Sequence, residues 1–215
     1  KEIKSIILAA GKGSRMDSHL PKVLHKVDGT PMIQLVTNTF KSIDKITENI
    51  LVLGHKKDLI LNLLGSTTPY VLQEEQLGTG HAVKMAKEYF KDFKGDIFIA
   101  YGDCPLLTPE TIKTFIEEHN KSNTVCSILT AHLDNPTGYG RIVKKFGYVM
   151  EIIEELDADQ ETKDIKEVNS GVYIVDSVKL FEAVDAIENH NVKGEYYLTD
   201  IVDYFVKNNL KVNSY

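Results

Sequence analysis

The sequence contains few cysteines and no long apolar run. Among its 215 residues, cysteine occurs only at Cys104 and Cys126, and no Cys-x-x-Cys pair is present. Two isolated thiols are typical of a reduced, cytoplasmic protein and not of a disulfide-stapled secreted one. The longest apolar runs, such as residues 6–10, are too short to cross a bilayer, and Lys12 and Arg15 follow at once. We therefore expect neither a membrane helix nor a secretion signal.

An excess of positive charge is also missing. The chain has 25 basic and 31 acidic residues, a formal net charge of −6, which argues against broad binding to nucleic acid or to an anionic membrane. The charge is unevenly distributed, however. Residues 11–26 carry bases at Lys12, Arg15, Lys22 and Lys26 but a single acid, Asp17. This basic segment in an acidic chain predicts a small anionic ligand.

Apolar segments alternate with helix-like segments through the first 134 residues. We expect buried strands at residues 5–10, 49–53, 70–73, 96–101 and 124–132, and helices at 30–43, 56–64, 79–90 and from 108 onward. Thr30 is expected to cap a helix with Pro31 as its first residue, and Thr108-Pro109-Glu110 to begin another. This alternation predicts βαβ units, and hence a mostly parallel sheet.

From about Asn135 the pattern changes. Turn residues at 136–140 precede two strand-like segments, 141–145 and 148–154, which predict a hairpin lying over the main sheet. A buried strand at 168–175, helices at 177–188 and 196–208, and a strand-like end at 210–215 follow. We find no repeat or linker, so the prediction is one α/β domain with a small β-rich elaboration.

The most informative segment runs from Ile6 to Met16 and is followed by Pro21-Lys22. An apolar strand there ends in a glycine-rich turn, which is where open α/β sheets bind ligands. Glycines allow backbone N–H groups to approach phosphate, and an arginine and a lysine can hold it. The dinucleotide fingerprint would need a glycine at Met16, and the P-loop needs a Gly-Lys-Ser/Thr that is absent. The turn therefore indicates a phosphate loop of another kind.

Asp103 follows the predicted strand at 96–101 and so lies at the same edge of the sheet as this turn. It could accept turn N–H bonds before Pro105, or it could bind Mg²⁺. Magnesium takes one or two carboxylates together with substrate phosphates, so a single aspartate is sufficient to suggest a site. The neighbouring Cys104 could act as a nucleophile, but no base accompanies it in the sequence.

Six segments together carry a resemblance. Residues 8–16 with Pro21-Lys22 closely resemble the signature of sugar-1-phosphate nucleotidyltransferases. The order and spacing of residues 73–82, 101–106, 135–142, 169–171 and 194–200 are similar to the N-terminal uridylyltransferase (pyrophosphorylase) domain of bacterial bifunctional UDP-N-acetylglucosamine pyrophosphorylase and glucosamine-1-phosphate N-acetyltransferase enzymes. The resemblance covers nearly the whole chain.

The resemblance implies a Rossmann-like nucleotide-diphospho-sugar transferase fold and transfer of UMP from UTP to N-acetylglucosamine-1-phosphate, releasing pyrophosphate. By the family pattern, the catalytic cations are Arg15 and Lys22, and the metal ligand for Mg²⁺ is Asp103. The residues implied for the nucleotide are Leu8, Ala9, Ala10, Gly11, Gln73, Gly78 and Thr79, and those for the sugar side are Tyr101, Gly102, Gly140, Glu154 and Asn169. The attacking phosphate is already anionic, so we expect direct in-line displacement by positioning and fixed cations, without a general base.

The same resemblance implies an approximate division into a nucleotide-binding half, residues 1–134, and a sugar-binding half, residues 135–215. In the family a second metal ligand, an asparagine, lies beyond the position of Tyr215, and the relatives continue into a β-helix acetyltransferase domain that forms trimers. No hexapeptide repeat is present in this sequence. We expect a monomer for this stretch of chain, and a trimer where a β-helix domain accompanies it.

Three alternatives stay open. A relative acting on another sugar-1-phosphate or nucleotide shares the same phosphate loop. A catalytically silent sensor of UDP-sugars is compatible with a metal site that has one ligand here. A flavodoxin-like electron carrier is a weaker third alternative.

Overall fold

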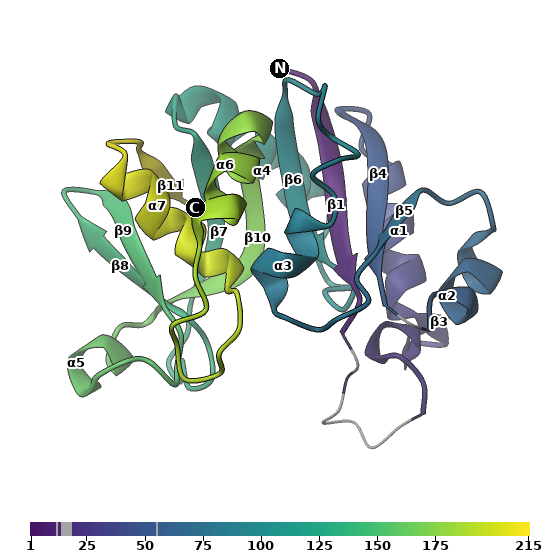
Figure 1. Ribbon diagram of the computed structural model, residues 1–215, viewed down its shortest axis with the longest axis horizontal. Coiled ribbons are helices and arrows are strands. Elements are labelled where there is room, and N and C mark those ends of the chain that lie inside the picture. The colour runs from purple at the N-terminus through teal and green to yellow at the C-terminus, as the bar shows by residue number, and fades with distance from the viewer. Residues whose placement is uncertain (12, 14–18, 55) are drawn as a thin grey trace.

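The computed structural model describes residues 1–11, 13, 19–54 and 56–215 (Figure 1). The strands are β1 (Ile3–Ala9), β2 (Lys26–Val27), β3 (Thr30–Pro31), β4 (Ile46–Leu53), β5 (Tyr70–Leu72), β6 (Asp96–Tyr101), β7 (Cys126–His132), β8 (Arg141–Lys145), β9 (Tyr148–Ile153), β10 (Glu167–Asp176) and β11 (Val212–Ser214). The α-helices are α1 (Met32–Lys41), α2 (Lys57–Leu64), α3 (Thr79–Lys84), α4 (Pro109–Ser122), α5 (Gln160–Lys163), α6 (Ser177–Ala186) and α7 (Ile201–Lys207). Short 3-10 helices lie at Lys22–Leu24 and Leu198–Asp200.

Within the described residues, one large sheet runs in the order β11–β7–β10–β6–β1–β4–β5. Strands β6, β1, β4 and β5 are parallel neighbours, and β11 is parallel to β7. Only β10 runs against its two neighbours in this path, β6 and β7. The predicted α/β fold with a mostly parallel sheet is therefore confirmed, with one reversed strand that the alternation of segments did not indicate.

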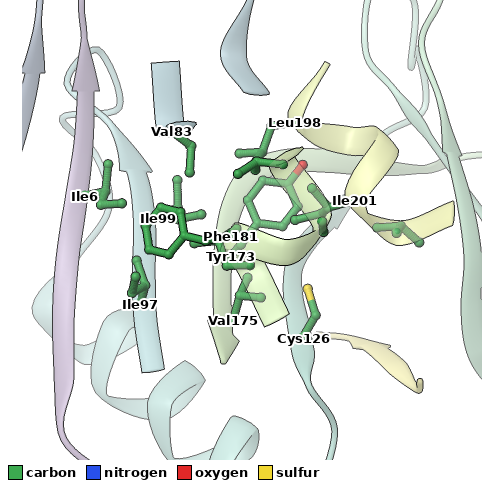
Figure 2. Close-up of a cluster of buried hydrophobic side chains, with 14 of the residues drawn as sticks. Ile6, Val83, Ile97, Ile99, Cys126, Tyr173, Val175, Phe181, Leu198 and Ile201 are labelled. Atoms are coloured by element: carbon green, nitrogen blue, oxygen red, sulfur yellow. The ribbon is translucent and has the colours of Figure 1, made fainter. Parts of the chain in front are cut away.

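Helices cover both faces of the sheet, which explains why its strands are apolar on both sides. In β1, Ile6 packs in one buried cluster with Val83 of α3 and Phe181 of α6, whereas Ile7 packs in the other with Ile33 of α1. Figure 2 shows the first cluster, in which side chains from the sheet meet those of α3, α6 and α7. Each fully buried isoleucine contributes about 2 kcal/mol through removal of apolar area from water.

The β8–β9 hairpin turns at Phe146 and Gly147, both with positive φ, as the sequence indicated. Its placement differs from the prediction. Arg141 of β8 pairs with Val168 of β10, so the hairpin branches from the sheet by hydrogen bonding and does not simply lie over it. This branch brings the turn before β8 to the edge of β10.

Several predicted helix boundaries were wrong. The helix expected at 196–208 begins only at Ile201, after the 3-10 helix at Leu198–Asp200. Thr30 does not cap a helix; it pairs with Val27 across a tight turn at Asp28 and Gly29, so α1 begins only at Met32. The helix expected at 79–90 ends at Lys84, because bonds such as Ala86 N to the Val83 carbonyl tighten the following segment into turns. By contrast, the predicted start of α4 is confirmed.

At the start of α4, the Thr108 hydroxyl accepts a hydrogen bond from the Thr111 N–H at 3.2 Å, and Pro109 is the first helical residue.

In the part of the chain that the structure describes, no helix combines the length and apolarity that crossing a membrane requires.

Candidate functional site

A cavity of ≈ 250 Å³ opens at the carboxyl ends of β1 and β6, the place predicted for a ligand. All seven residues predicted for a nucleotide line it, together with Lys22, Tyr101 and Asp103. The lining also includes Gly13, a glycine of the predicted phosphate turn, and four residues that the sequence reasoning did not select: Val23, Gln76, Ala82 and Glu195. Arg15, the other predicted cation, lies outside the described residues.

Lys22 and Asp103 meet at the mouth of this cavity. Lys22 Nζ donates to Asp103 Oδ2 at 2.6 Å, although the two residues are far apart in the sequence. Gly13 packs closely against Lys22, since a Cβ on Gly13 would lie only 2.8 Å from the Lys22 Cβ. Gly13 also has φ +63°, a conformation that favours glycine. Lys22 thus places an ammonium group against a carboxylate.

This pairing bears on the predicted magnesium site. Among the described residues, no group of three or more His, Cys, Asp or Glu side chains could hold a metal by itself. Asp103 supplies one carboxylate at the cavity, a donor set that fits Mg²⁺ carried mainly by substrate phosphates and not an all-protein cage.

Cys104, next to Asp103 in the sequence, is a poor nucleophile, since burial raises the pKa of its thiol to about 11.

Gln73 is a buried residue of the cavity lining, and its amide nitrogen is already engaged. Its Nε2 donates to the Gly78 carbonyl at 3.2 Å and lies 3.0 Å from His81 Nδ1. Burial lowers the pKa of His81, which favours the neutral ring that can accept this hydrogen bond. With its N–H groups bonded inside the protein, Gln73 retains its carbonyl oxygen for a ligand.

Gln76 presents the complementary group. Its Nε2 is buried and has no hydrogen-bond partner among the described residues, and the residue lines the cavity. The turn that carries it is fixed by the Tyr196 backbone, which donates to the Leu77 carbonyl and accepts from Gly80 N, both at 2.8 Å. The sequence signal for Gln76 was its place three residues after Gln73 in the same turn, but only the tertiary structure shows an unpaired donor there.

Three residues predicted for the sugar side, Gly140, Glu154 and Asn169, come together beyond this cavity. Asn169 N donates to the Gly140 carbonyl at 2.9 Å, and a Cβ on Gly140 would lie 3.4 Å from Glu154 Oε1. Thr199 donates its hydroxyl to the same Glu154 oxygen at 3.3 Å. Burial raises the pKa of Glu154, because removal from water disfavours the charged carboxylate.

Tyr101 connects the two groups of residues. It lines the cavity and interacts with the Thr79 hydroxyl, and burial raises the pKa of its phenol. On its other side, a Cβ on Gly171, two residues after Asn169, would lie 2.6 Å from the Tyr101 ring. Tyr101 therefore contacts both the cavity and the segment that carries Asn169.

Gly102 does not line the cavity. A Cβ there would meet Ile33 at 2.7 Å and Ala9 at 3.2 Å, and its N–H donates to the Leu8 carbonyl. The structure thus gives Gly102 a packing position behind β1, unlike the neighbouring Tyr101 and Asp103.

Comparison with known proteins places the chain among nucleotidyltransferases. A family model described as "MobA-like NTP transferase domain" matches residues 5–170. Proteins named "Bifunctional protein GlmU" from Streptococcus gordonii and Streptococcus uberis are each 46% identical over 214 residues. Each match covers 98% of this chain and 46% of the relative, so the chain spans about half the length of the curated relatives it matches. The resemblance drawn from the six segments is confirmed.

Solved structures confirm the fold class. A putative glucose-1-phosphate thymidylyltransferase from Bacillus anthracis, in complex with a sucrose, matches with a TM-score of 0.79 at 22% identity, covering 99% of this chain and 86% of that one. A UDP-glucose pyrophosphorylase complexed with UDP-glucose matches with a TM-score of 0.74 at 18% identity, covering 99% and 90%. At these identities the likeness concerns the fold alone.

Proposed function

This chain belongs to the family of MobA-like NTP transferase domains, and we propose that it transfers UMP from UTP to N-acetylglucosamine-1-phosphate, giving UDP-N-acetylglucosamine and pyrophosphate. The observation that carries the proposal is the cavity at the ends of β1 and β6, where a glycine-rich turn, a lysine and buried amides meet. The identity to proteins named GlmU over nearly the whole chain supports this choice of substrates.

The nucleotide is proposed to enter this cavity with its base against Gln73 and Gln76. Uracil offers an N–H donor at N3 flanked by carbonyl acceptors. The Gln73 carbonyl and the unpartnered Gln76 N–H supply the opposite pair, an acceptor and a donor. Cytosine has an acceptor at N3 and an amino donor beside it. The Gln73 carbonyl would then face an acceptor, and the Gln76 N–H would face a donor.

The triphosphate is proposed to lie over the glycine-rich turn, held by Lys22 and Arg15. Both cations would stabilise the charge that develops on the departing pyrophosphate, and this electrostatic effect replaces acid–base catalysis in the proposed step. Attack by an oxygen of the sugar phosphate on the α-phosphorus forms one P–O bond as the bond to pyrophosphate breaks. The transfer is therefore direct, with no covalent enzyme intermediate.

Asp103 is the residue proposed to hold Mg²⁺, together with phosphate oxygens of the substrates. When bound, the ion supplies positive charge between two polyanions that otherwise repel each other. In the structure, Asp103 Oδ2 accepts a hydrogen bond from Lys22 Nζ. Metal binding at this carboxylate would therefore release Lys22, whose ammonium group would bind the triphosphate instead.

The sugar phosphate is proposed to lie on the far side of Tyr101, among Gly140, Glu154 and Asn169. This assigns residues 1–134 mainly to the nucleotide and residues 135–215 mainly to the sugar. The setting proposed for the reaction is the cytoplasm, with small-molecule substrates and neither nucleic acid nor membrane as a partner.

A substrate panel tests the proposal. The purified protein is incubated with Mg²⁺, each of the four NTPs and several sugar-1-phosphates, and pyrophosphate release is measured. We expect the highest kcat/KM with UTP and N-acetylglucosamine-1-phosphate. A preference for another pair contradicts the substrate assignment, and binding of UDP-N-acetylglucosamine without turnover of any pair favours a sensor.

A further inference from the structure

Arg141 is a charged side chain buried in the sugar half of the chain. It is 1% exposed, and each arm of its guanidinium group has a partner. Nη2 donates to Glu155 Oε2 at 2.7 Å, Nε donates to the Lys163 carbonyl at 3.3 Å, and Nη1 donates to the Tyr139 carbonyl. A guanidinium group bonded in this way joins two backbone carbonyls and one carboxylate around itself.

Glu155 closes the arrangement from the other side. The oxygen that accepts from Arg141 also accepts the Gly138 N–H at 3.2 Å, and the Arg141 side chain holds the pKa of this carboxyl group below its ordinary value. The turn before β8 is therefore attached to the end of β9 by two bonds, one from the Arg141 side chain and one from the Gly138 backbone.

The position of this ion pair relates directly to the three residues proposed to bind the sugar. Gly140 immediately precedes Arg141, and Glu154 immediately precedes Glu155. Asn169 follows Val168, the residue of β10 that pairs with Arg141 in the sheet. Each of the three sugar-side residues is thus the sequence neighbour of Arg141 or of a residue that Arg141 contacts.

We propose that Arg141 and Glu155 form a clamp that sets the spacing of Gly140, Glu154 and Asn169 for the sugar phosphate. They are positioning residues, since Arg141 is buried and its donors are used within the protein. The proposal rests on the proposed function for the identity of the sugar substrate. The geometric part, that the ion pair fixes the Gly140–Asn169 contact, is independent of it.

A comparison of the KM values for the two substrates distinguishes a positioning role at the sugar from a general loss of stability. Arg141→Lys keeps the charge but loses the planar fork, and we expect it to raise the KM for N-acetylglucosamine-1-phosphate roughly tenfold with a change in the KM for UTP of about twofold or less. Glu155→Gln removes the charge but retains an acceptor for Gly138, and we expect the same direction of change. If both constants rise equally in both variants, the clamp has no specific role at the sugar.

Lys144→Met is the matched control. Lys144 lies on the same strand and makes a salt bridge of 2.7 Å with Glu167, which adjoins none of the three sugar-side residues. We expect this variant to leave the KM for the sugar phosphate unchanged. An equal rise in the control would overturn the proposal.

Amide hydrogen exchange tests the geometry without any substrate. In Arg141→Lys and Glu155→Gln we expect faster exchange at Asn169 N–H, which donates to the Gly140 carbonyl, and not in Lys144→Met. Unchanged exchange in both clamp variants would overturn the proposal even if the kinetic constants moved. An inactive wild type with the expected exchange pattern contradicts the proposed function and supports the clamp geometry.

Discussion

Lys22 Nζ lies 2.6 Å from Asp103 Oδ2, joining the segment after β1 to the segment after β6. The two side chains are 47% and 24% exposed, so the pair is open to a ligand at the cavity mouth. A residue proposed to hold phosphate and one proposed to hold the metal are therefore paired with each other. In the proposed mechanism, substrate binding exchanges this contact for contacts to phosphate and metal.

Lys22→Met should lower kcat/KM about a hundredfold, because it removes a fixed cation from the developing charge on pyrophosphate. The free energy of unfolding should change by less than about 1 kcal/mol, since partly exposed ion pairs contribute little to stability. Pyrophosphate release and chemical denaturation measure the two effects. Lys45→Met, which removes an exposed 3.3 Å pair with Glu117, is the control and should leave both nearly unchanged.

Gly13→Ala should weaken UTP binding through Lys22. A Cβ at Gly13 would lie 2.8 Å from the Lys22 Cβ, and its φ of +63° disfavours any other residue. We expect a loss of about 1 kcal/mol in stability and a rise in the KM for UTP of roughly tenfold.

Gly29→Ala separates backbone strain from crowding. Gly29 also has positive φ, +82°, but a Cβ there would have no atom of residues 1–11, 13, 19–54 or 56–215 within 4 Å beyond its own neighbours in the chain. This variant should lose similar stability and keep the wild-type KM for UTP. A similar rise in KM in both variants would show that strain, and not displacement of Lys22, is responsible.

Gln76→Leu should affect stability and binding in opposite directions. In the part of the chain that the structure describes, the buried Nε2 of Gln76 has no partner, so its removal should leave the free energy of unfolding unchanged or raise it by about 1 kcal/mol. Loss of a donor to the base should raise the KM for UTP roughly tenfold. Thermal unfolding and a UTP titration check both effects, and an unchanged KM would remove Gln76 from nucleotide recognition.

Asp200→Asn should alter how stability depends on pH. Burial, and after it the nearby Asp203, raises the pKa of Asp200 to about 6 from 3.8. The folded protein therefore binds this proton more tightly than the unfolded chain does. The resulting stabilisation is fully present below about pH 4 and is lost as the pH rises through about 6.

The substitution removes this titration, because the amide is neutral throughout. The free energy of unfolding of the variant relative to wild type should therefore rise between pH 4 and pH 7 and level off above it. Urea denaturation at a series of pH values measures this difference. A difference that is constant across the series would show that Asp200 does not titrate in this range.

Much of the strand pattern was predictable because apolar runs report burial directly. β6 was predicted with the bounds it has, and the start of α4 followed from Thr108 and Pro109. The start of α1 was not predictable in this way. Thr30 pairs with Val27 in a short two-stranded sheet and is therefore not available to cap a helix. This pairing depends on the turn at Gly29.

The cavity lining was predictable around the glycine-rich turn and less so elsewhere. The glycine-rich turn is a local motif, so the residues near Gly11 were identifiable from the sequence. Gln76 and Glu195 were not selected, because they reach the cavity through contacts between distant segments, as Tyr196 fastens the turn after Gln76. Whether an amide is left unpaired depends on its neighbours in space.

Local sequence was sufficient to predict the alternation of buried strands and helices and the glycine-rich turn after the first strand, because these features depend on neighbouring residues and on the spacing of apolar residues. Three relationships emerge only in the folded chain: β10 runs against β6 and β7, Lys22 meets Asp103, and Arg141 donates to the Lys163 carbonyl. These relationships join residues tens of positions apart. Such contacts are selected by packing of the whole chain and not by any local pattern.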